Sequence, residues 1–238
     1  SAVKSFEWAI AYSPNYAEAY NNLGSALQEL KQFKDAKKQF EKATSINPNY
    51  DQAFHNLGIL SEIINLSKDA VSHYERAVAI NPEFAEAYRN LSKVKKFKAK
   101  DPQINQIQSL YSEKNLNIAD KARFGFALAS INKDLGNKEA FINYIEKVLA
   151  LNPNLGHAYY HLSHVKKFTK DDMQIKQMQR ALKISSLDSI DRIGLNFALA
   201  KVFEDLEEPE RQFMFLNEAN NLRKKELNYT INKDKKLF

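Results

Sequence analysis

The heptapeptide PNYAEAY at residues 14–20 returns as PNYDQAF at residues 48–54 and as PEFAEAY at residues 82–88. Consecutive copies begin 34 residues apart, at Pro14, Pro48 and Pro82. A Leu-Gly pair follows the first two copies, at residues 23–24 and 57–58. Self-similarity at a fixed period of about 20 to 50 residues is typical of chains that stack one supersecondary unit many times. A repeat therefore determines the fold of this chain.

Each repeat contains two apolar patterns at helical spacing, which in the first copy are Tyr20, Leu23 and Leu27, and then Ala36, Phe40 and Ala43. This spacing predicts two amphipathic helices in each unit. An Asn-Pro pair ends the second helix at residues 47–48, 81–82 and 152–153, because the residue before proline is disfavoured in the α region. Gly24 and Gly58 fall inside a helix, where glycine costs about 1 kcal/mol relative to alanine. We expect that a side chain at these positions would block close approach of another helix.

The pattern of aromatic, Leu-Gly, alanine, aromatic, alanine and proline at these spacings resembles the tetratricopeptide repeat, a helix–turn–helix unit of about 34 residues. The resemblance implies an all-α, right-handed superhelical solenoid. It also implies a protein- or peptide-binding module rather than an enzyme, with no cofactor.

A leucine followed by a small residue marks each repeat and recurs six times, beginning at Leu23, Leu57, Leu91, Leu128, Leu162 and Leu199. The spacings are 34, 34, 37, 34 and 37 residues. We therefore predict a solenoid over residues 1–226, with six repeats that start near residues 17, 51, 85, 122, 156 and 193. Residues 1–15 are predicted to be the second helix of a truncated repeat, so we expect at least one further helix before Ser1. Residues 227–238 are predicted to be a tail or linker.

The third and fifth repeats share a variant, in which LSKVKKF at 91–97 corresponds to LSHVKKF at 162–168. The same shift along the chain, which we call the duplication offset, relates Asp101 to Asp172 and FALA at 126–129 to FALA at 197–200. A duplicated two-repeat unit explains this offset. Asp101-Pro102 predicts a helix N-cap with proline at the first helical position, and Asp171-Asp172 predicts the same cap without proline. A purely structural linker also explains this variant.

The last third of the chain carries a narrower resemblance, on LSHVKKF at 162–168, DDMQI at 171–175, FALAK at 197–201 and NEAN at 217–220. These segments resemble the repeat region upstream of the catalytic domain in bacterial tetratricopeptide-repeat sulfotransferases. In that family the catalytic domain transfers a sulfuryl group from 3′-phosphoadenosine 5′-phosphosulfate by means of a Gly-rich phosphate-binding loop. The chain has no glycine after Gly194, and such loops need glycine for close backbone approach. The sequence thus predicts a non-catalytic region, with a stand-alone scaffold as the alternative.

The composition excludes several functions. The chain has no cysteine, which rules out disulfides, thiol catalysis and Cys-ligated metals and fits a reducing, cytoplasmic setting. No apolar run reaches the roughly 18 residues that a membrane span needs. The net charge of +6 favours partners with acidic groups. The oligomeric state is left open.

The resemblance implies that the first helix of each repeat lines the inner surface of the solenoid. The predicted peptide-binding residues on that surface are Asn22, Asn56, Asn90, Asn21, Ser25, His55, Arg89, Lys93, Lys96, His161, His164 and Lys167. An asparagine ladder at residues 22, 56 and 90 offers amide donors and acceptors to an extended backbone, and the cations attract acidic groups. The alternatives are local hydrogen bonding for the asparagines and a solvated helix face for the cations.

Two other functions are weaker hypotheses. His157, His161 and His164 fall on one helical face, and three histidines can hold zinc, but their counterparts at the duplication offset, Glu86, Asn90 and Lys93, form no ligand set. The Lys-Lys-Phe segments at 95–97 and 166–168 resemble a surface for stacking nucleic-acid bases. Their phenylalanines lie at helical spacing from core positions, which favours packing. We predict no metal site and no nucleic-acid partner.

Overall fold

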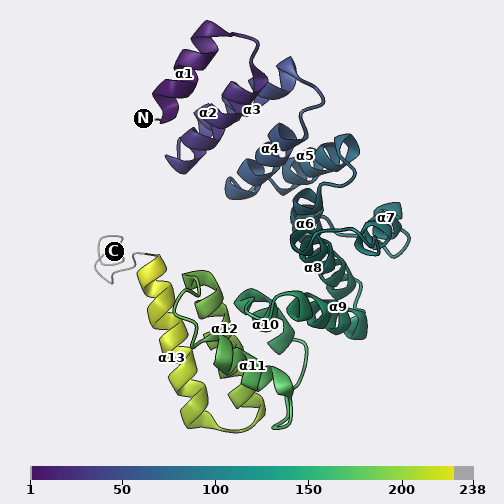
Figure 1. Cartoon of the computed structure of the whole chain (residues 1–238), viewed down its shortest axis with the longest axis vertical. Helices are drawn as coiled ribbons and strands as arrows, with labels where there is room; N and C mark the ends of the chain where they lie inside the picture. Colours follow the sequence, from purple (N-terminus) through teal and green to yellow (C-terminus); the bar gives the residue numbers. More distant parts are fainter. Residues whose placement is uncertain (1, 228–238) are drawn as a thin grey trace. The chain divides into compact units, whose positions relative to one another are not determined.

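The computed structural model describes residues 2–227, and within this range it contains 13 α-helices and no β-strand (Figure 1). The predicted all-α fold is confirmed. The helices are α1 (Ala2–Tyr12), α2 (Ala17–Glu29), α3 (Phe33–Ile46), α4 (Asp51–Ile63), α5 (Ser67–Ile80), α6 (Ala85–Val94), α7 (Pro102–Tyr111), α8 (Ile118–Asp134), α9 (Lys138–Leu151), α10 (Gly156–Ser163), α11 (Met173–Ala181), α12 (Ser189–Asp205) and α13 (Pro209–Glu226).

The chain divides into two compact units, Ser1–Leu135 and Gly136–Phe238. We call them the amino-terminal unit, with α1 to α8, and the carboxy-terminal unit, with α9 to α13, and we describe each by itself. Helices α2, α4, α6 and α10 begin where repeats are predicted near residues 17, 51, 85 and 156. Helices α8 and α12 begin four residues before the predicted starts at 122 and 193. The predicted tail lies outside the described residues except for Leu227.

In the first two repeats, the two helices of the pair approach closely at a glycine of the first helix. A Cβ atom on Gly24 of α2 would lie 2.7 Å from the Phe40 ring of α3. A Cβ atom on Gly58 of α4 would overlap the Tyr74 ring of α5 even more. Phe40 and Tyr74 are both fully buried, so neither ring can move aside. The predicted reason for a mid-helix glycine is confirmed at both positions.

Four turns between consecutive helices use one residue with a positive φ angle: Lys31 (60°), Asn65 (60°), Gly136 (77°) and Glu207 (58°). After Lys31, the backbone N–H of Gln32 donates to the carbonyl of Leu27 at 2.9 Å, which closes the end of α2 in the manner of a Schellman motif. The third and fifth repeats have no such residue. Instead, irregular segments at residues 95–101 and 164–172 join their helices.

In the third repeat, Lys95 holds the irregular segment in place. Its ammonium lies 2.9 Å from carboxylate oxygens of both Glu75 and Asp101, and 4.8 Å from the ring centroid of the buried Phe97. Asp101 also accepts from the backbone N–H of Gln103 at 3.1 Å, so the predicted N-cap is confirmed. The cation thus joins α5, the irregular segment and the start of α7.

The fifth repeat reproduces this arrangement at the duplication offset, with one correction. The Lys166 ammonium lies 2.7 Å from Asp172 and 3.6 Å from Glu146, and 5.3 Å from the Phe168 ring centroid. Asp172 is the N-cap residue of α11 as predicted, but its side chain makes no capping bond to the first turn of that helix. The carboxylate turns back and accepts from the N–H of Thr169 at 2.7 Å. The burial of Phe97 and Phe168 also supports packing over base stacking.

We expect Gly58→Leu to destabilise the chain by about 1–3 kcal/mol, because the added side chain overpacks the crossing of α4 with α5 at Tyr74. Urea denaturation followed by circular dichroism measures the change. Gln52→Leu is the matched control, since it adds the same side chain at an exposed position of the same helix. Equal stability of the two variants would contradict this packing.

Candidate functional site

Side-chain hydrogen bonds link the first helices of consecutive repeats in the amino-terminal unit. The Asn56 amide on α4 donates to the Asn21 side chain on α2 at 2.9 Å. One repeat later, the Asn90 amide on α6 lies 3.1 Å from Nε2 of His55 on α4. Both pairs span 35 residues of sequence. The amide nitrogens of Asn56 and Asn90 therefore join neighbouring repeats, which is the local role that the sequence left open; a role in ligand binding stays a prediction.

The remaining predicted residues of α2 differ in how they are engaged. The hydroxyl of Ser25 donates to the carbonyl of Asn21 in its own helix at 3.2 Å. Asn22 is exposed, and its side chain has no hydrogen-bond partner among residues 2–227. Of the three ladder asparagines, Asn22 has the amide most open to a ligand.

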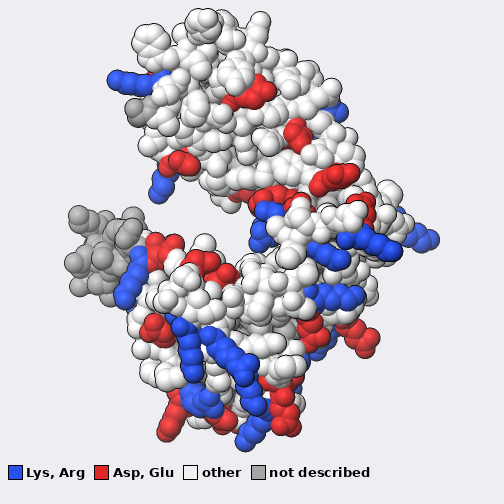
Figure 2. All heavy atoms as spheres, in the orientation of Figure 1, with Lys and Arg blue, Asp and Glu red and all other residues white. Residues whose placement is uncertain are grey.

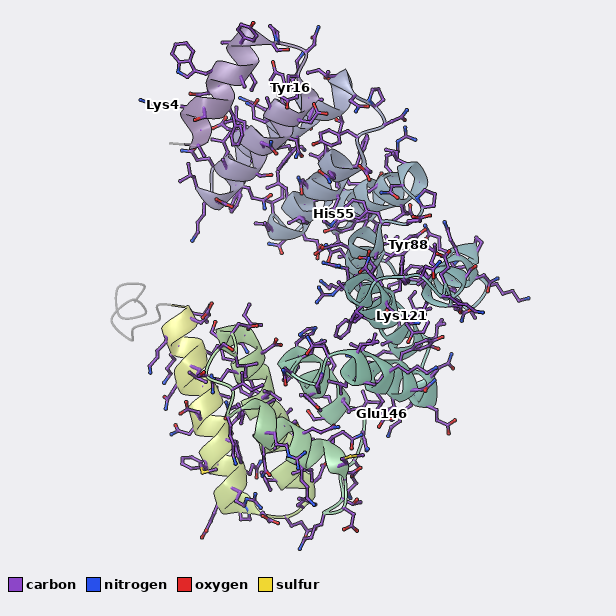
Figure 3. The ribbon with its side chains drawn as sticks, viewed as in Figure 1. Lys4, Tyr16, His55, Tyr88, Lys121 and Glu146 are labelled. Atoms are coloured by element: carbon purple, nitrogen blue, oxygen red, sulfur yellow. The ribbon has the colours of Figure 1, made fainter. Side chains whose placement is uncertain are left out.

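His55 is buried between α4, α5 and α6 (Figure 3). Its ring centroid lies 5.6 Å from that of Tyr74 and 4.8 Å from that of Phe84. Because an amide NH₂ group can only donate, Nε2 must accept from Asn90, which requires a neutral imidazole. Burial lowers the pKa of His55 and Lys93 adds to the effect, while Glu86 and Asp51 oppose it.

Asn90 also bonds to Lys93. The Lys93 ammonium donates to the Asn90 side-chain oxygen at 2.9 Å, so both ends of the Asn90 amide are engaged. One asparagine therefore connects a buried imidazole to a cation on the surface of α6.

Arg89 and Lys93 form a pair of cations on one face of α6, one turn apart. Arg89 is partly buried and its guanidinium lies 5.2 Å from the Phe126 ring centroid on α8. Lys93 is accessible to solvent, yet the surrounding protein partly desolvates its ammonium, which lowers its pKa, and Arg89 lowers it further. Burial likewise lowers the pKa of Arg89.

The carboxylates nearest to these cations are already engaged. Glu86 pairs with Arg123 at 3.4 Å, and Glu62 accepts from the hydroxyl of Tyr74. Neither Arg89 nor Lys93 has a carboxylate within ion-pair distance in the described part of the chain. We call Arg89 and Lys93 the cation pair; its positive charge is compensated only at longer range.

Lys96 lies near the cation pair in sequence but differs in its contacts. Its ammonium lies 3.0 Å from Asp134 and its side chain is 82% exposed. On the face shown in Figure 2, lysine and arginine side chains lie among carboxylates rather than in one continuous basic area. The sequence alone did not distinguish the compensated Lys96 from the cation pair.

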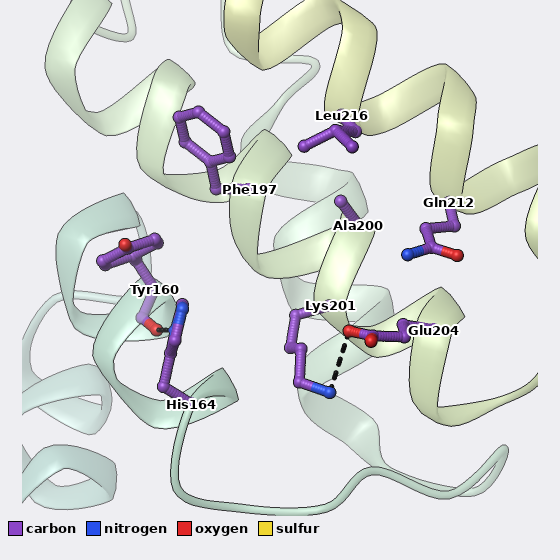
Figure 4. Close-up of a pocket in the computed structure, with 8 residues that line it drawn as sticks. All are labelled: Tyr160, His164, Phe197, Ala200, Lys201, Glu204, Gln212 and Leu216. Atoms are coloured by element: carbon purple, nitrogen blue, oxygen red, sulfur yellow. Dashed lines mark hydrogen bonds and ion pairs between the residues drawn. The ribbon is translucent and has the colours of Figure 1, made fainter.

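The carboxy-terminal unit contains an open groove of about 260 Å³ between α10, α12 and α13 (Figure 4). The residues that line this groove, which we call the aromatic groove, are Tyr160, His164, Phe197, Ala200, Lys201, Glu204, Gln212 and Leu216. Of the predicted residues in this unit, only His164 belongs to it. Sequence reasoning missed its α12 and α13 residues, although Phe197 corresponds to Phe126 at the duplication offset.

The histidines predicted as a weak metal candidate have other contacts. His157 lies 3.2 Å from Asp191, and Nδ1 of His164 lies 2.8 Å from the carbonyl of Tyr160. The His161 ring packs edge-on against Tyr160, and Lys167 is exposed. Among the described residues, no group of three metal-ligating side chains is positioned to hold an ion. None of the described helices is long and apolar enough to cross a membrane.

Two segments of the chain, residues 17–50 and residues 122–155, match sequence models of the tetratricopeptide repeat. Together with the stacked helix pairs, these matches define a tetratricopeptide-repeat protein. No curated protein sequence matches the chain.

Solved structures share the fold at low sequence identity. PilW, a widely conserved type IV pilus biogenesis factor, superposes with a TM-score of 0.63 and 14% identity, over 93% of this chain and 98% of PilW. The Cut9–Hcn1 hetero-tetramer of the APC/C superposes with a TM-score of 0.64 and 17% identity, over 91% of this chain but 42% of the matched chain. YrrB, a tetratricopeptide-repeat protein with an unusual peptide-binding site, superposes with a TM-score of 0.50 and 17% identity, over 79% of this chain and 96% of YrrB. At these identities the likeness establishes the fold alone.

The lowered pKa of His55 predicts a stability that falls in acid. An unfolded histidine titrates near pH 6.5, so below that pH the unfolded chain takes up a proton that folded His55 resists, and unfolding becomes more favourable. We expect His55→Gln to reduce the loss of stability between pH 7.5 and 5.5, measured by urea denaturation at both values.

His73, whose pKa is also lowered mainly by burial, titrates in both proteins, so the difference between them isolates His55. The exposed His161→Gln is the control. An unchanged pH dependence in His55→Gln would show that His55 is readily protonated in the folded protein.

Proposed function

We propose that the chain binds an acidic segment of a partner protein, and that the cation pair on α6 holds an acidic group of that segment. The observation that carries this proposal is the engagement of Glu86 and Glu62 elsewhere, which leaves Arg89 and Lys93 without a close carboxylate. A ligand carboxylate would provide the missing counter-charge. The net charge of +6 supports an acidic partner.

The two cations suit different parts of such a ligand. A guanidinium presents a planar fork that can bind a carboxylate through two parallel hydrogen bonds, whereas an ammonium acts as a compact point charge. Phe126 packs against the Arg89 guanidinium and Asn90 positions the Lys93 ammonium. Because both cations are held by neighbouring side chains, less conformational entropy is lost on binding.

The open amide of Asn22 supports an extended ligand. First helices of stacked repeats form a continuous surface along which a ligand can contact several repeats. In the amino-terminal unit these helices are α2, α4, α6 and α8, and the bonds at Asn56 and Asn90 connect the first three. A partner segment along this row would place its backbone near Asn22 and its acidic group near α6.

The proposal leaves two settings open. The resemblance of the last third suggests a partner- or substrate-binding region of a sulfotransferase; none of the matches described above names such an enzyme. The alternative is a scaffold that assembles a protein complex. The coding sequence downstream of Phe238 distinguishes them. The absence of cysteine supports a cytoplasmic location in either setting.

We expect Arg89→Gln and Lys93→Gln each to weaken binding of a fluorescent peptide with three consecutive aspartates by roughly tenfold, because a hydrogen bond to a charged group contributes about 1.5–3 kcal/mol. Fluorescence anisotropy measures the dissociation constants. The affinity should also fall as salt rises from 50 to 300 mM, because salt screens exposed charges.

Two controls accompany this measurement. A peptide with asparagine in place of each aspartate should bind weakly to the wild type. Lys42→Gln removes an exposed lysine of α3 and should leave binding unchanged. If Lys42→Gln and the cation-pair variants lost affinity equally, only net charge would matter and the assignment to α6 would be wrong.

A further inference from the structure

The duplication places different chemistry at matching positions of the two units. At the duplication offset, Arg89 corresponds to Tyr160, Lys93 to His164 and Phe126 to Phe197. The geometry is retained: the Arg89 guanidinium lies 5.2 Å from the Phe126 ring centroid, and the Tyr160 ring lies 6.1 Å from that of Phe197, edge-on. A cationic surface in the amino-terminal unit thus has an aromatic counterpart in the carboxy-terminal unit.

Rings and aliphatic side chains form the inside of the aromatic groove. Tyr160 packs at 4.4 Å against the His164 ring and edge-on against Phe197, and Ala200 lies beside them on α12 (Figure 4). From α13, Leu216 contributes a side chain that is 38% exposed although it is apolar. Aromatic rings prefer edge-on or offset contacts with other rings, and the groove leaves room for one more.

The lysine at the rim of the groove is paired with carboxylates. The Lys201 ammonium lies 2.9 Å from both Glu204 and Asp205, so its charge is balanced within α12. Gln212 is partly buried at the rim, and its side-chain amide has no hydrogen-bond partner among residues 2–227. The groove therefore offers an apolar interior and one open amide, in contrast to the charged surface of α6.

We propose that the aromatic groove binds a tryptophan or tyrosine side chain of an uncharged segment of a partner protein. The volume of about 260 Å³ lies below the roughly 300–1,000 Å³ typical of sites for drug-sized ligands, and suits a single side chain. The ring packs among Tyr160, Phe197 and Leu216, and the polar end of the side chain bonds to the Gln212 amide. This inference rests on the proposed function in that the ligand belongs to a protein. It concerns the other unit, and an apolar groove rather than a pair of cations.

The test titrates the whole chain with N-acetyl-tryptophan amide and follows the methyl resonances of Ala200 and Leu216 by NMR. We expect saturable shifts with a dissociation constant in the millimolar range, similar shifts with N-acetyl-tyrosine amide, and at least tenfold weaker binding of N-acetyl-alanine amide and N-acetyl-glutamate amide. Equal shifts with all four probes, or shifts spread over methyl groups remote from the groove, would overturn the proposal.

A swap between the duplicated positions provides the decisive variants. Tyr160→Arg with His164→Lys gives the groove the side chains of the amino-terminal unit, and we expect at least a tenfold loss of tryptophan-probe binding. The reciprocal change, Arg89→Tyr with Lys93→His, is the matched control and should leave the shifts of Ala200 and Leu216 unchanged. Thermal melting checks that both variants are folded, and Gln212→Leu, at the rim, should weaken the tyrosine probe more than N-acetyl-phenylalanine amide.

Full binding of the tryptophan probe by a folded Tyr160→Arg, His164→Lys variant would refute the assignment. The result is independent of the acidic-peptide measurement, because that experiment depends on α6 and this one on α10, α12 and α13. Failure of the acidic peptide together with success of the tryptophan probe would overturn only the function proposed for the cation pair.

Discussion

The contact between a helical glycine and a buried aromatic ring is the constraint on which the amino-terminal repeats depend. The Phe40 and Tyr74 rings occupy the space of the missing Cβ atoms of Gly24 and Gly58, which fixes the register of the two helices in each pair. A fixed register determines which residues of the first helix are available to contact the neighbouring repeats. Asn21 on α2 can meet Asn56 on α4, and His55 on α4 can meet Asn90 on α6, because α2 and α4 are held in this way. The cation pair on α6 is positioned through the same sequence of contacts.

The sequence period predicted the helices and the close crossings because both depend on residues within one repeat. The turns were harder to predict, since Lys31, Asn65 and Glu207 adopt a positive φ angle that glycine usually provides. The side chain of Asp172, although at the predicted N-cap, does not cap α11 because its carboxylate bonds to Lys166 and Thr169 instead. The roles of Asn56, Asn90 and Lys96 depend on partners 35 to 38 residues away. A repeat period contains no information on how such side chains pair.

The two copies of the duplicated two-repeat unit differ at surface positions, while their internal support is the same. Both copies keep a lysine between two carboxylates and over a phenylalanine, at Lys95 and at Lys166. The partly or fully exposed positions near them differ, with cations at Arg89 and Lys93 and aromatic rings at Tyr160 and His164. A scaffold fixed by buried contacts can exchange such surface residues with little effect on its stability. Divergence after duplication is a direct way for a chain of repeats to acquire two chemically different surfaces.

The lysine that supports the third repeat also has a consequence for chemical modification. Only a neutral amine attacks an acylating reagent, so the reactivity of a lysine depends on its pKa and its exposure. At Lys95 burial acts to lower the pKa, but hydrogen bonds to Asp101 and Glu75 outweigh it and raise the pKa, whereas desolvation and Arg89 lower that of the accessible Lys93. Two lysines that are two residues apart therefore differ in nucleophilicity. Of these two lysines, Lys93 would react faster than Lys95 with a reactive thioester, and its acetylation would remove one charge of the cation pair while leaving the ion pairs of Lys95 in place.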